Sequence, residues 1–145
     1  MKRSVAIFVA CLLFILAAPA SAGDVIDSKT AFDRVRSGDV TLVDVRSPRE
    51  WRETGLPQGA RAITIHGPDG MAGFVADATR VVSGRKDQAI ALICARGWRS
   101  HRAAAALREA GFTNIINVRE GMLGNPLDGP GWLDRKLPTV PCSNC

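Results

Sequence analysis

The chain has 145 residues, of which 46% are apolar and 23% charged, and its formal net charge is +5. This length corresponds to one ordinary globular domain, and the average charge fraction excludes a disordered or fibrous chain. The sequence has no dense block of lysine and arginine, so its positive charge does not indicate nucleic-acid binding.

The first 22 residues have the pattern of a secretory signal peptide. Lys2 and Arg3 precede residues 5–18, which lack polar side chains, and the small residues Ala20 to Ala22 follow. A membrane-spanning helix needs about 20 apolar residues, more than this run supplies, although an uncleaved anchor is the alternative. We expect cleavage after Ala22, a mature chain of net charge +3 without a stable membrane span, and a periplasmic or secreted location.

From residue 23 onward, short apolar runs alternate with helical patterns. Helices are predicted over 28–37, from Pro48 to the residue before Gly55, over 71–82 and over 100–110, and strands over 41–45, 60–65, 89–93 and 115–118. Ser47 is expected to cap the second helix, with Glu50 completing a capping box. Strands that alternate with helices indicate an α/β domain over residues 23–122, with a mostly parallel central sheet and helices on both faces.

Residues 123–145 differ in character, because glycines and prolines interrupt every periodic pattern. We expect an irregular tail that wraps back on the domain through Trp132 and Leu133. A loosely ordered extension is the alternative.

Cys94 stands between a predicted buried strand and a predicted helix that begins at Ser100. Ligand sites in parallel sheets lie at the carboxyl ends of the strands, where a helix N-terminus supplies free N–H groups and a partial positive charge. Arg96 and Arg99 add two cations. These features favour a thiolate at the mouth of the sheet and an anionic substrate. The alternative is a buried and inert core cysteine.

Residues 94–100, Cys-Ala-Arg-Gly-Trp-Arg-Ser, resemble the active-site loop of the rhodanese family of sulfurtransferases. Residues 42–51 resemble the second marker of that family, a strand ending in Asp-Val-Arg before a short helix with Glu, and residues 55–57 and 59–60 extend the match. The resemblance covers Val25 to Met122 and is closest to secreted single-domain members. One departure is Leu56, where the family commonly has a histidine.

The resemblance implies that Cys94 takes the outer sulfur of thiosulfate or a similar donor, holds it as a persulfide, and passes it to a thiol or to cyanide. It implies no cofactor. A tight loop can direct backbone N–H groups at the sulfur, so we expect the substrate-binding residues to be Ala95, Arg96, Gly97, Trp98 and Arg99. Arg99 is expected to organise the loop and attract the anion, and Arg96 to be a more exposed steering charge.

Other polar residues are predicted to have structural roles. Asp44, Arg46 and Glu50 are interpreted as scaffold, because a carboxylate at the end of a buried strand needs partners, and Arg46 is expected to pair with Glu50 across the helix start. His66 and His101 have no partner at ligand spacing, so no metal site is expected.

The chain ends in Cys142-Ser143-Asn144-Cys145. In an oxidising compartment, Cys142 and Cys145 are expected to form a disulfide with each other. A sharper hypothesis is that the tail folds over the Cys94 loop and that one of its thiols accepts sulfur.

Two other functions remain open on this sequence. Cysteine-dependent phosphatases and arsenate reductases also place a Cys and an Arg on an anion-binding loop, but with five intervening residues and a preceding His. Here four residues separate Cys94 from Arg99, and Ile93 precedes the cysteine. The second alternative is a non-catalytic binding module or a slow persulfide carrier on the rhodanese scaffold.

Overall fold

A computed structural model of the protein describes residues 24–145, so the predicted signal peptide lies outside the described residues. Five parallel strands form the central sheet in the order β1-β6-β5-β2-β4. Their bounds are β1 (Val25–Ile26), β2 (Thr41–Asp44), β4 (Arg61–Ala62), β5 (Ile90–Ile93) and β6 (Ile115–Val118). A second, two-stranded sheet pairs β3 (Leu56–Pro57) with β7 (Thr139–Val140) in antiparallel register.

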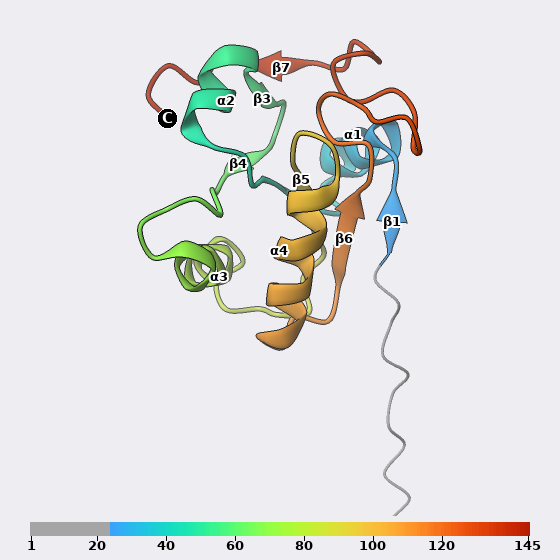
Figure 1. Ribbon diagram of the computed structural model, residues 1–145. Helices are drawn as coiled ribbons and strands as arrows, with labels where there is room; N and C mark the ends of the chain where they lie inside the picture. The colour runs from blue at the N-terminus through green and yellow to red at the C-terminus, as the bar shows by residue number, and fades with distance from the viewer. Residues whose placement is uncertain (1–23) are drawn as a thin grey trace, which may run out of the picture.

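Four helices complete the domain: α1 (Ser28–Ser37), α2 (Pro48–Thr54), α3 (Gly70–Val81) and α4 (Trp98–Glu109). In Figure 1, α3 and α4 cover one face of the central sheet and α1 covers the other. The prediction of an α/β domain with a mostly parallel sheet and helices on both faces is therefore confirmed. Within residues 24–145, no helix combines the length and apolar character needed to cross a bilayer.

The alternation of side chains along β5 determines which face of the central sheet the Cys94 side chain points to. Ile90 and Leu92 belong to the core beneath α3 and α4, whereas Ala91 and Ile93 belong to the core beneath α1. Because successive side chains of a strand point to opposite faces, Cys94 continues the first set. It belongs to the α3/α4 core.

The predicted elements are present, although several of their ends differ from the prediction. The strand predicted over 60–65 is regular only over two residues, although the N–H groups of Ile63 and Ile65 still donate to the carbonyls of Asp44 and Val45. The two-residue strands β1, β3 and β7 were not predicted. Helix α4 begins at Trp98 and not at Ser100, because Gly97 adopts the left-handed conformation and forms the N-cap.

The segment after residue 122 packs against the domain. The Trp132 side chain is fully buried in the core under α1, with its ring in edge-to-face contact with Phe32 at a centroid distance of 5.7 Å. Its indole N–H donates to the Pro138 carbonyl at 3.0 Å. Strand β7 then brings the end of the chain beside α2, as Figure 1 shows.

Candidate active site

The loop that connects β5 to α4 lies at the carboxyl end of the sheet. Its turn depends on Gly97, whose φ of +91° lies in the left-handed region that side chains disfavour. A Cβ atom at this position would also overlap the carbonyl oxygen of Arg119. Gly97 is therefore required twice, for the conformation of the loop and for the close approach of the neighbouring backbone.

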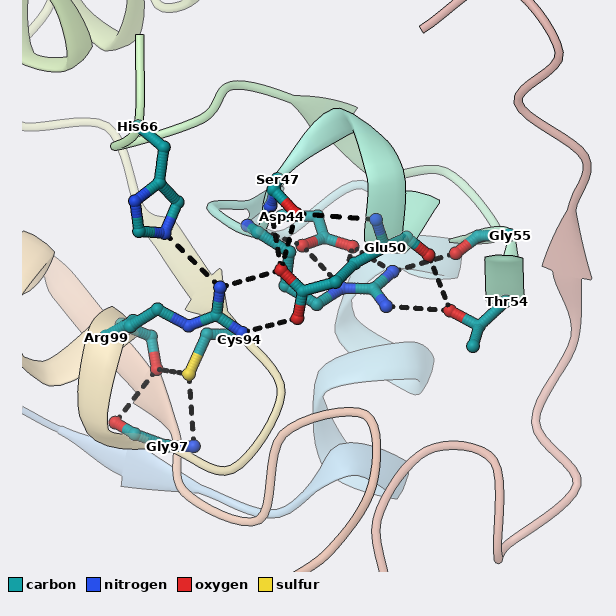
Figure 2. Close-up of polar contacts among 11 residues, drawn as sticks. Asp44, Ser47, Glu50, Thr54, Gly55, His66, Cys94, Gly97 and Arg99 are labelled. Carbon is teal, nitrogen blue, oxygen red and sulfur yellow. Dashed lines mark hydrogen bonds and ion pairs between the residues drawn. The ribbon is translucent and has the colours of Figure 1, made fainter. Parts of the chain in front are cut away.

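The sulfur of Cys94 lies inside this turn. The backbone N–H of Gly97 donates to Cys94 Sγ at 3.1 Å, and the Ser100 hydroxyl oxygen lies 3.4 Å from the sulfur (Figure 2). Ser100 Oγ is also 3.0 Å from the Gly97 carbonyl, and its single hydrogen serves one acceptor at a time. The donors beside Sγ are thus of the kind that stabilises negative charge on sulfur.

The Cys94 sulfur, predicted at the mouth of the sheet, is not open to solvent. Only 1% of Cys94 is exposed, because the alternation along β5 directs its side chain into the α3/α4 core. The site combines polar donors on one side of the sulfur with apolar packing around the rest of the side chain.

Arg99 and Glu50 form a two-point ion pair between α4 and α2. Arg99 Nη1 donates to Glu50 Oε2 at 2.7 Å, and Nη2 donates to Oε1 at 2.5 Å. The hydrogen bonds from Arg99 are the main reason that the pKa of the Glu50 carboxyl falls to about 2, against an opposing effect of burial. The same hydrogen bonds raise the pKa of Arg99. Figure 2 shows Arg99 beside Cys94, held there by this carboxylate.

Glu50 also caps the helix to which it belongs. Its Oε2 accepts hydrogen bonds from the Ser47 backbone N–H at 3.0 Å and from the Ser47 hydroxyl at 2.8 Å, which confirms the predicted capping box. One carboxylate therefore fixes the start of α2 and the side chain of Arg99 together.

The predicted pairing of Arg46 with Glu50 is wrong. Arg46 turns back to Asp44, donating from Nε at 3.0 Å to each carboxylate oxygen and from Nη2 at 2.7 Å to Oδ2. Its other hydrogens reach the Thr54 hydroxyl at 2.7 Å and the Gly55 carbonyl at 2.8 Å. Arg46 and Asp44 are both almost fully buried, so this pair joins the end of β2 to the end of α2 while Glu50 is left to Arg99.

Residues 121–123, which follow β6, hold the Cys94 loop in place through backbone hydrogen bonds. The N–H groups of Met122 and Leu123 donate to the carbonyls of Cys94 and Ala95 at 2.8 and 2.9 Å. A Cβ on Gly121 would lie 2.5 Å from the Cys94 carbonyl oxygen, so only glycine allows this contact. The backbone of the loop is thus held by a neighbouring segment and not by its own side chains alone.

Two of the predicted substrate-binding residues turn away from the sulfur. Arg96 is exposed, and its Nη1 donates to the Gly124 carbonyl at 2.9 Å. The Trp98 side chain is exposed as well. Both line a cavity that Cys94 and Arg99 do not line.

Cys142 and Cys145 are joined by a disulfide. This end of the chain lies at α2, where Arg52 donates to the Cys145 carbonyl. Residues 24–145 contain no group of three or more His, Cys, Asp or Glu side chains placed to hold a metal ion.

Two residues of the site were not identified from the sequence. Ser100 was interpreted only as a helix start, but as the third residue of α4 it faces inward onto Cys94 Sγ. His66 was interpreted as isolated, yet its Nε2 lies 3.3 Å from Arg99 Nη1. The position of Ser100, six residues after the cysteine in the first turn of the helix, is a signal available in the sequence, whereas the proximity of His66 depends on the tertiary fold.

Several known proteins are similar to this chain. A sulfurtransferase from Allochromatium vinosum is 28% identical over 116 residues, which cover 79% of this chain and 92% of that protein. The probable adenylyltransferase/sulfurtransferase MoeZ of Mycobacterium tuberculosis is 32% identical over 111 residues, 74% of this chain but only 26% of that protein. The structure of a polysulfide-sulfur transferase from Wolinella succinogenes superposes with a TM-score of 0.60 at 25% identity, covering 84% of this chain and 81% of that one.

The match to a family model spans the elements that build the site. Residues 28–124 match the rhodanese-like domain, a range that runs from α1 through the segment bracing the Cys94 loop. The chain therefore belongs to the rhodanese-like family of sulfurtransferases.

Proposed function

We propose that the protein transfers a sulfane sulfur from an anionic donor, such as thiosulfate, to a thiophilic acceptor through a persulfide on Cys94. The observation that supports this most directly is the Cys94 sulfur, which accepts from the Gly97 N–H at the N-terminus of α4 with Ser100 beside it. Cysteine is the most nucleophilic side chain near neutral pH, and covalent catalysis divides one difficult transfer into two easier ones.

The first half-reaction forms the persulfide. The Cys94 thiolate attacks the outer sulfur of thiosulfate, a new Sγ–S bond forms, and the S–S bond of the donor breaks, with its electron pair leaving on sulfite. In the second half-reaction an acceptor thiolate, or cyanide, attacks the outer sulfur of the persulfide. The Sγ–S bond then breaks and its electron pair restores the Cys94 thiolate.

The site residues divide these tasks by their contacts. The Gly97 N–H donates to Cys94 Sγ, which carries negative charge as a thiolate before the first half-reaction and after the second. Arg99 attracts the anionic donor. Glu50 positions the guanidinium group of Arg99 through the two-point ion pair. Arg96, which is more exposed, is the outer steering charge.

Since only 1% of Cys94 is exposed, the proposed reaction includes an opening of the loop that admits the donor. The test is mass spectrometry of the protein after incubation with thiosulfate, with polysulfide as a second donor because the relative from Wolinella succinogenes carries that name. We expect a gain of one sulfur atom that cyanide removes and that Cys94→Ala abolishes. The double variant Cys142→Ser/Cys145→Ser is the matched control and retains the gain. No sulfur gain with either donor would exclude the proposal.

The burial of Cys94 also favours the second function, a persulfide carrier that loads sulfur slowly and gives it to one acceptor. The same samples distinguish the two. Steady release of thiocyanate from thiosulfate and cyanide supports the enzyme, whereas loading of one sulfur per chain without sustained turnover supports the carrier.

A periplasmic or secreted location is proposed on residues 1–22 alone. Mass measurement of the protein recovered from the periplasmic fraction of an expressing Gram-negative host tests it. A mature chain beginning at Gly23 is expected, and a chain that retains Met1 to Ala22 would contradict it.

A further inference from the structure

The disulfide between Cys142 and Cys145 joins two residues that are only three apart in the chain. The segment before it is already docked, because β7 pairs with β3 and the Gln58 N–H donates to the Pro138 carbonyl at 3.0 Å. The disulfide connects no helix or strand of the domain to another. Since the stabilising effect of a disulfide falls with the length of the loop that it closes, this bond does little to hold the fold together.

The two linked cysteines are accessible, in contrast to Cys94. Cys142 and Cys145 are each partly exposed, and the two residues between them, Ser143 and Asn144, are exposed. Only 1% of Cys94 is exposed. Exposed disulfides have less negative reduction potentials than structural ones and are the disulfides that exchange with thiols. The accessible sulfur chemistry of this structure therefore lies at the disulfide.

The disulfide faces away from the sulfur-transfer site. Arg52 on α2 donates to the Cys145 carbonyl, and Figure 1 shows this end of the chain beside α2. Glu50, on the same helix, pairs with Arg99 beside Cys94. Residues two apart in a helix are about 200° apart around its axis, so Glu50 and Arg52 point to nearly opposite sides of α2. Chemistry at the disulfide is thus separate from chemistry at Cys94.

We propose that Cys142 and Cys145 form a second reactive site, which exchanges electrons with a dithiol. A thiolate of the dithiol attacks one sulfur of the disulfide. A mixed disulfide forms, and the Cys142–Cys145 bond breaks with its electron pair leaving on the other sulfur. The second thiolate of the dithiol then attacks the dithiol's own sulfur in the mixed disulfide and releases the remaining cysteine as a thiolate.

This exchange reduces the Cys142–Cys145 pair by two electrons and oxidises the dithiol to its disulfide by the same two. The reverse reaction restores the bond between the two cysteines. Because the cysteines are three residues apart, each stays within reach of the other in the reduced chain. The proposal does not rest on sulfur transfer by Cys94.

The test equilibrates the Cys94→Ala variant, without denaturant, with an equal amount of reduced thioredoxin as the dithiol probe. Alkylation followed by mass spectrometry counts the thiols that appear, and the variant removes Cys94 from that count. We expect at least half of the chains to gain two alkyl groups. A structural disulfide, which is about tenfold or more harder to reduce than that of thioredoxin, would leave no more than about a quarter of the chains reduced.

Three further samples assign the reaction to the pair. The wild type is expected to show the same gain of two alkyl groups over its unreduced form. Cys142→Ser/Cys145→Ser is the matched control and gains none. Cys145→Ser keeps one thiol of the pair and is expected to form a lasting mixed disulfide with oxidised glutathione, because no second cysteine of the pair displaces it.

The proposal is overturned if fewer than half of the chains are reduced at equilibrium, approached from both directions, or if reduction requires denaturant. It is also overturned if reduction abolishes the near-ultraviolet circular dichroism of the folded protein, since the disulfide then holds the fold together. A failure of Cys94 to gain sulfur from thiosulfate would not alter either measurement, because the two reactions use different cysteines.

Discussion

Arg99 on α4 and Glu50 on α2 lie 49 residues apart in the chain and meet through two hydrogen bonds, of 2.7 and 2.5 Å. Because Glu50 also caps α2 through Ser47, the carboxylate connects the helix that follows β2 to the loop that holds Cys94. The negative charge of Glu50 takes part both in the ion pair with Arg99 and in the capping contacts with Ser47.

Glu50→Gln isolates that charge, because a glutamine at this position still completes a capping box. The pKa of Glu50 is about 2 in the folded protein against an ordinary value of 4.5, so the unfolded chain binds more protons between these values. The charge therefore stabilises the fold above about pH 5, and this contribution is lost as the pH falls towards about 2.

Urea denaturation of the wild type and of Glu50→Gln as a function of pH measures this effect. We expect the variant to be less stable by about 1–2 kcal/mol at pH 7, a figure reduced for the partial exposure of the pair, and equal to the wild type near pH 2. Glu53→Gln is a control on the solvent-exposed side of the same helix. A gap between wild type and Glu50→Gln that does not change with pH would contradict the assignment.

Arg99→Lys tests the role of the guanidinium group and keeps the positive charge. A lysine forms no two-point contact with Glu50, so its ammonium group is less well positioned beside Cys94. If the proposed sulfur transfer is correct, steady-state kinetics with thiosulfate will show a higher KM and a kcat/KM lower by about tenfold or more.

Arg102→Lys, an exposed substitution on the same helix, provides the comparison and is expected to retain the wild-type kinetics. Arg99→Glu, which places two carboxylates together, is expected to lose more than Arg99→Lys. Wild-type kinetics in Arg99→Glu would remove Arg99 from the site.

Gly97→Ala tests the turn around the sulfur. An alanine here has a left-handed backbone and a Cβ that overlaps the Arg119 carbonyl, so the loop must move and the N–H is displaced from Cys94 Sγ. We expect a loss of about 2–3 kcal/mol in unfolding free energy and the loss of persulfide formation.

Gly84→Ala separates the effect of the left-handed backbone from the effect of the overlap with the Arg119 carbonyl. Gly84 also has a positive φ, of +77°, but an added Cβ would meet no atom within 4 Å. Its loss of stability is expected to be about 1 kcal/mol, without an effect on sulfur loading. Equal losses in the two variants would show that the contact with Arg119 carries no weight.

Trp132→Ala tests whether the segment after residue 122 contributes to the stability of the domain. The side chain is fully buried against Phe32, so truncation is expected to lower the unfolding free energy by about 3–5 kcal/mol. Trp98→Ala removes the same side chain from an exposed position and is expected to change stability by no more than about 0.5 kcal/mol. A small loss in Trp132→Ala, measured by thermal denaturation, would show that the segment docks without stabilising the domain.

Local sequence patterns predicted most of the fold. Apolar alternation and helix-capping residues depend on near neighbours, and both the capping box at Ser47 and the helix over 28–37 are found where they were predicted. Cys94 was predicted to lie between a buried strand and a helix, and it does, although the helix begins at Trp98.

Several features that depend on distant contacts were not predicted. The direction of a long side chain such as Arg46 is decided by which buried carboxylate it meets, and both Asp44 and Glu50 lay within reach in the sequence. The start of α4 depended on Gly97 adopting a left-handed turn against Arg119, a contact made only in the folded chain. The burial of Cys94 depends in the same way on the packing of α3 and α4.

The bracing of the Cys94 loop by residues 121–123 runs through peptide groups, since amides of one segment meet carbonyls of the other. Contacts of this type use no side-chain atoms, so a substitution at the exposed Leu123 is expected to leave the shape of the turn unchanged, whereas Met122 is also held by its buried side chain. The bracing instead depends on Gly97 and Gly121, where a single methyl group would force the two backbone segments apart.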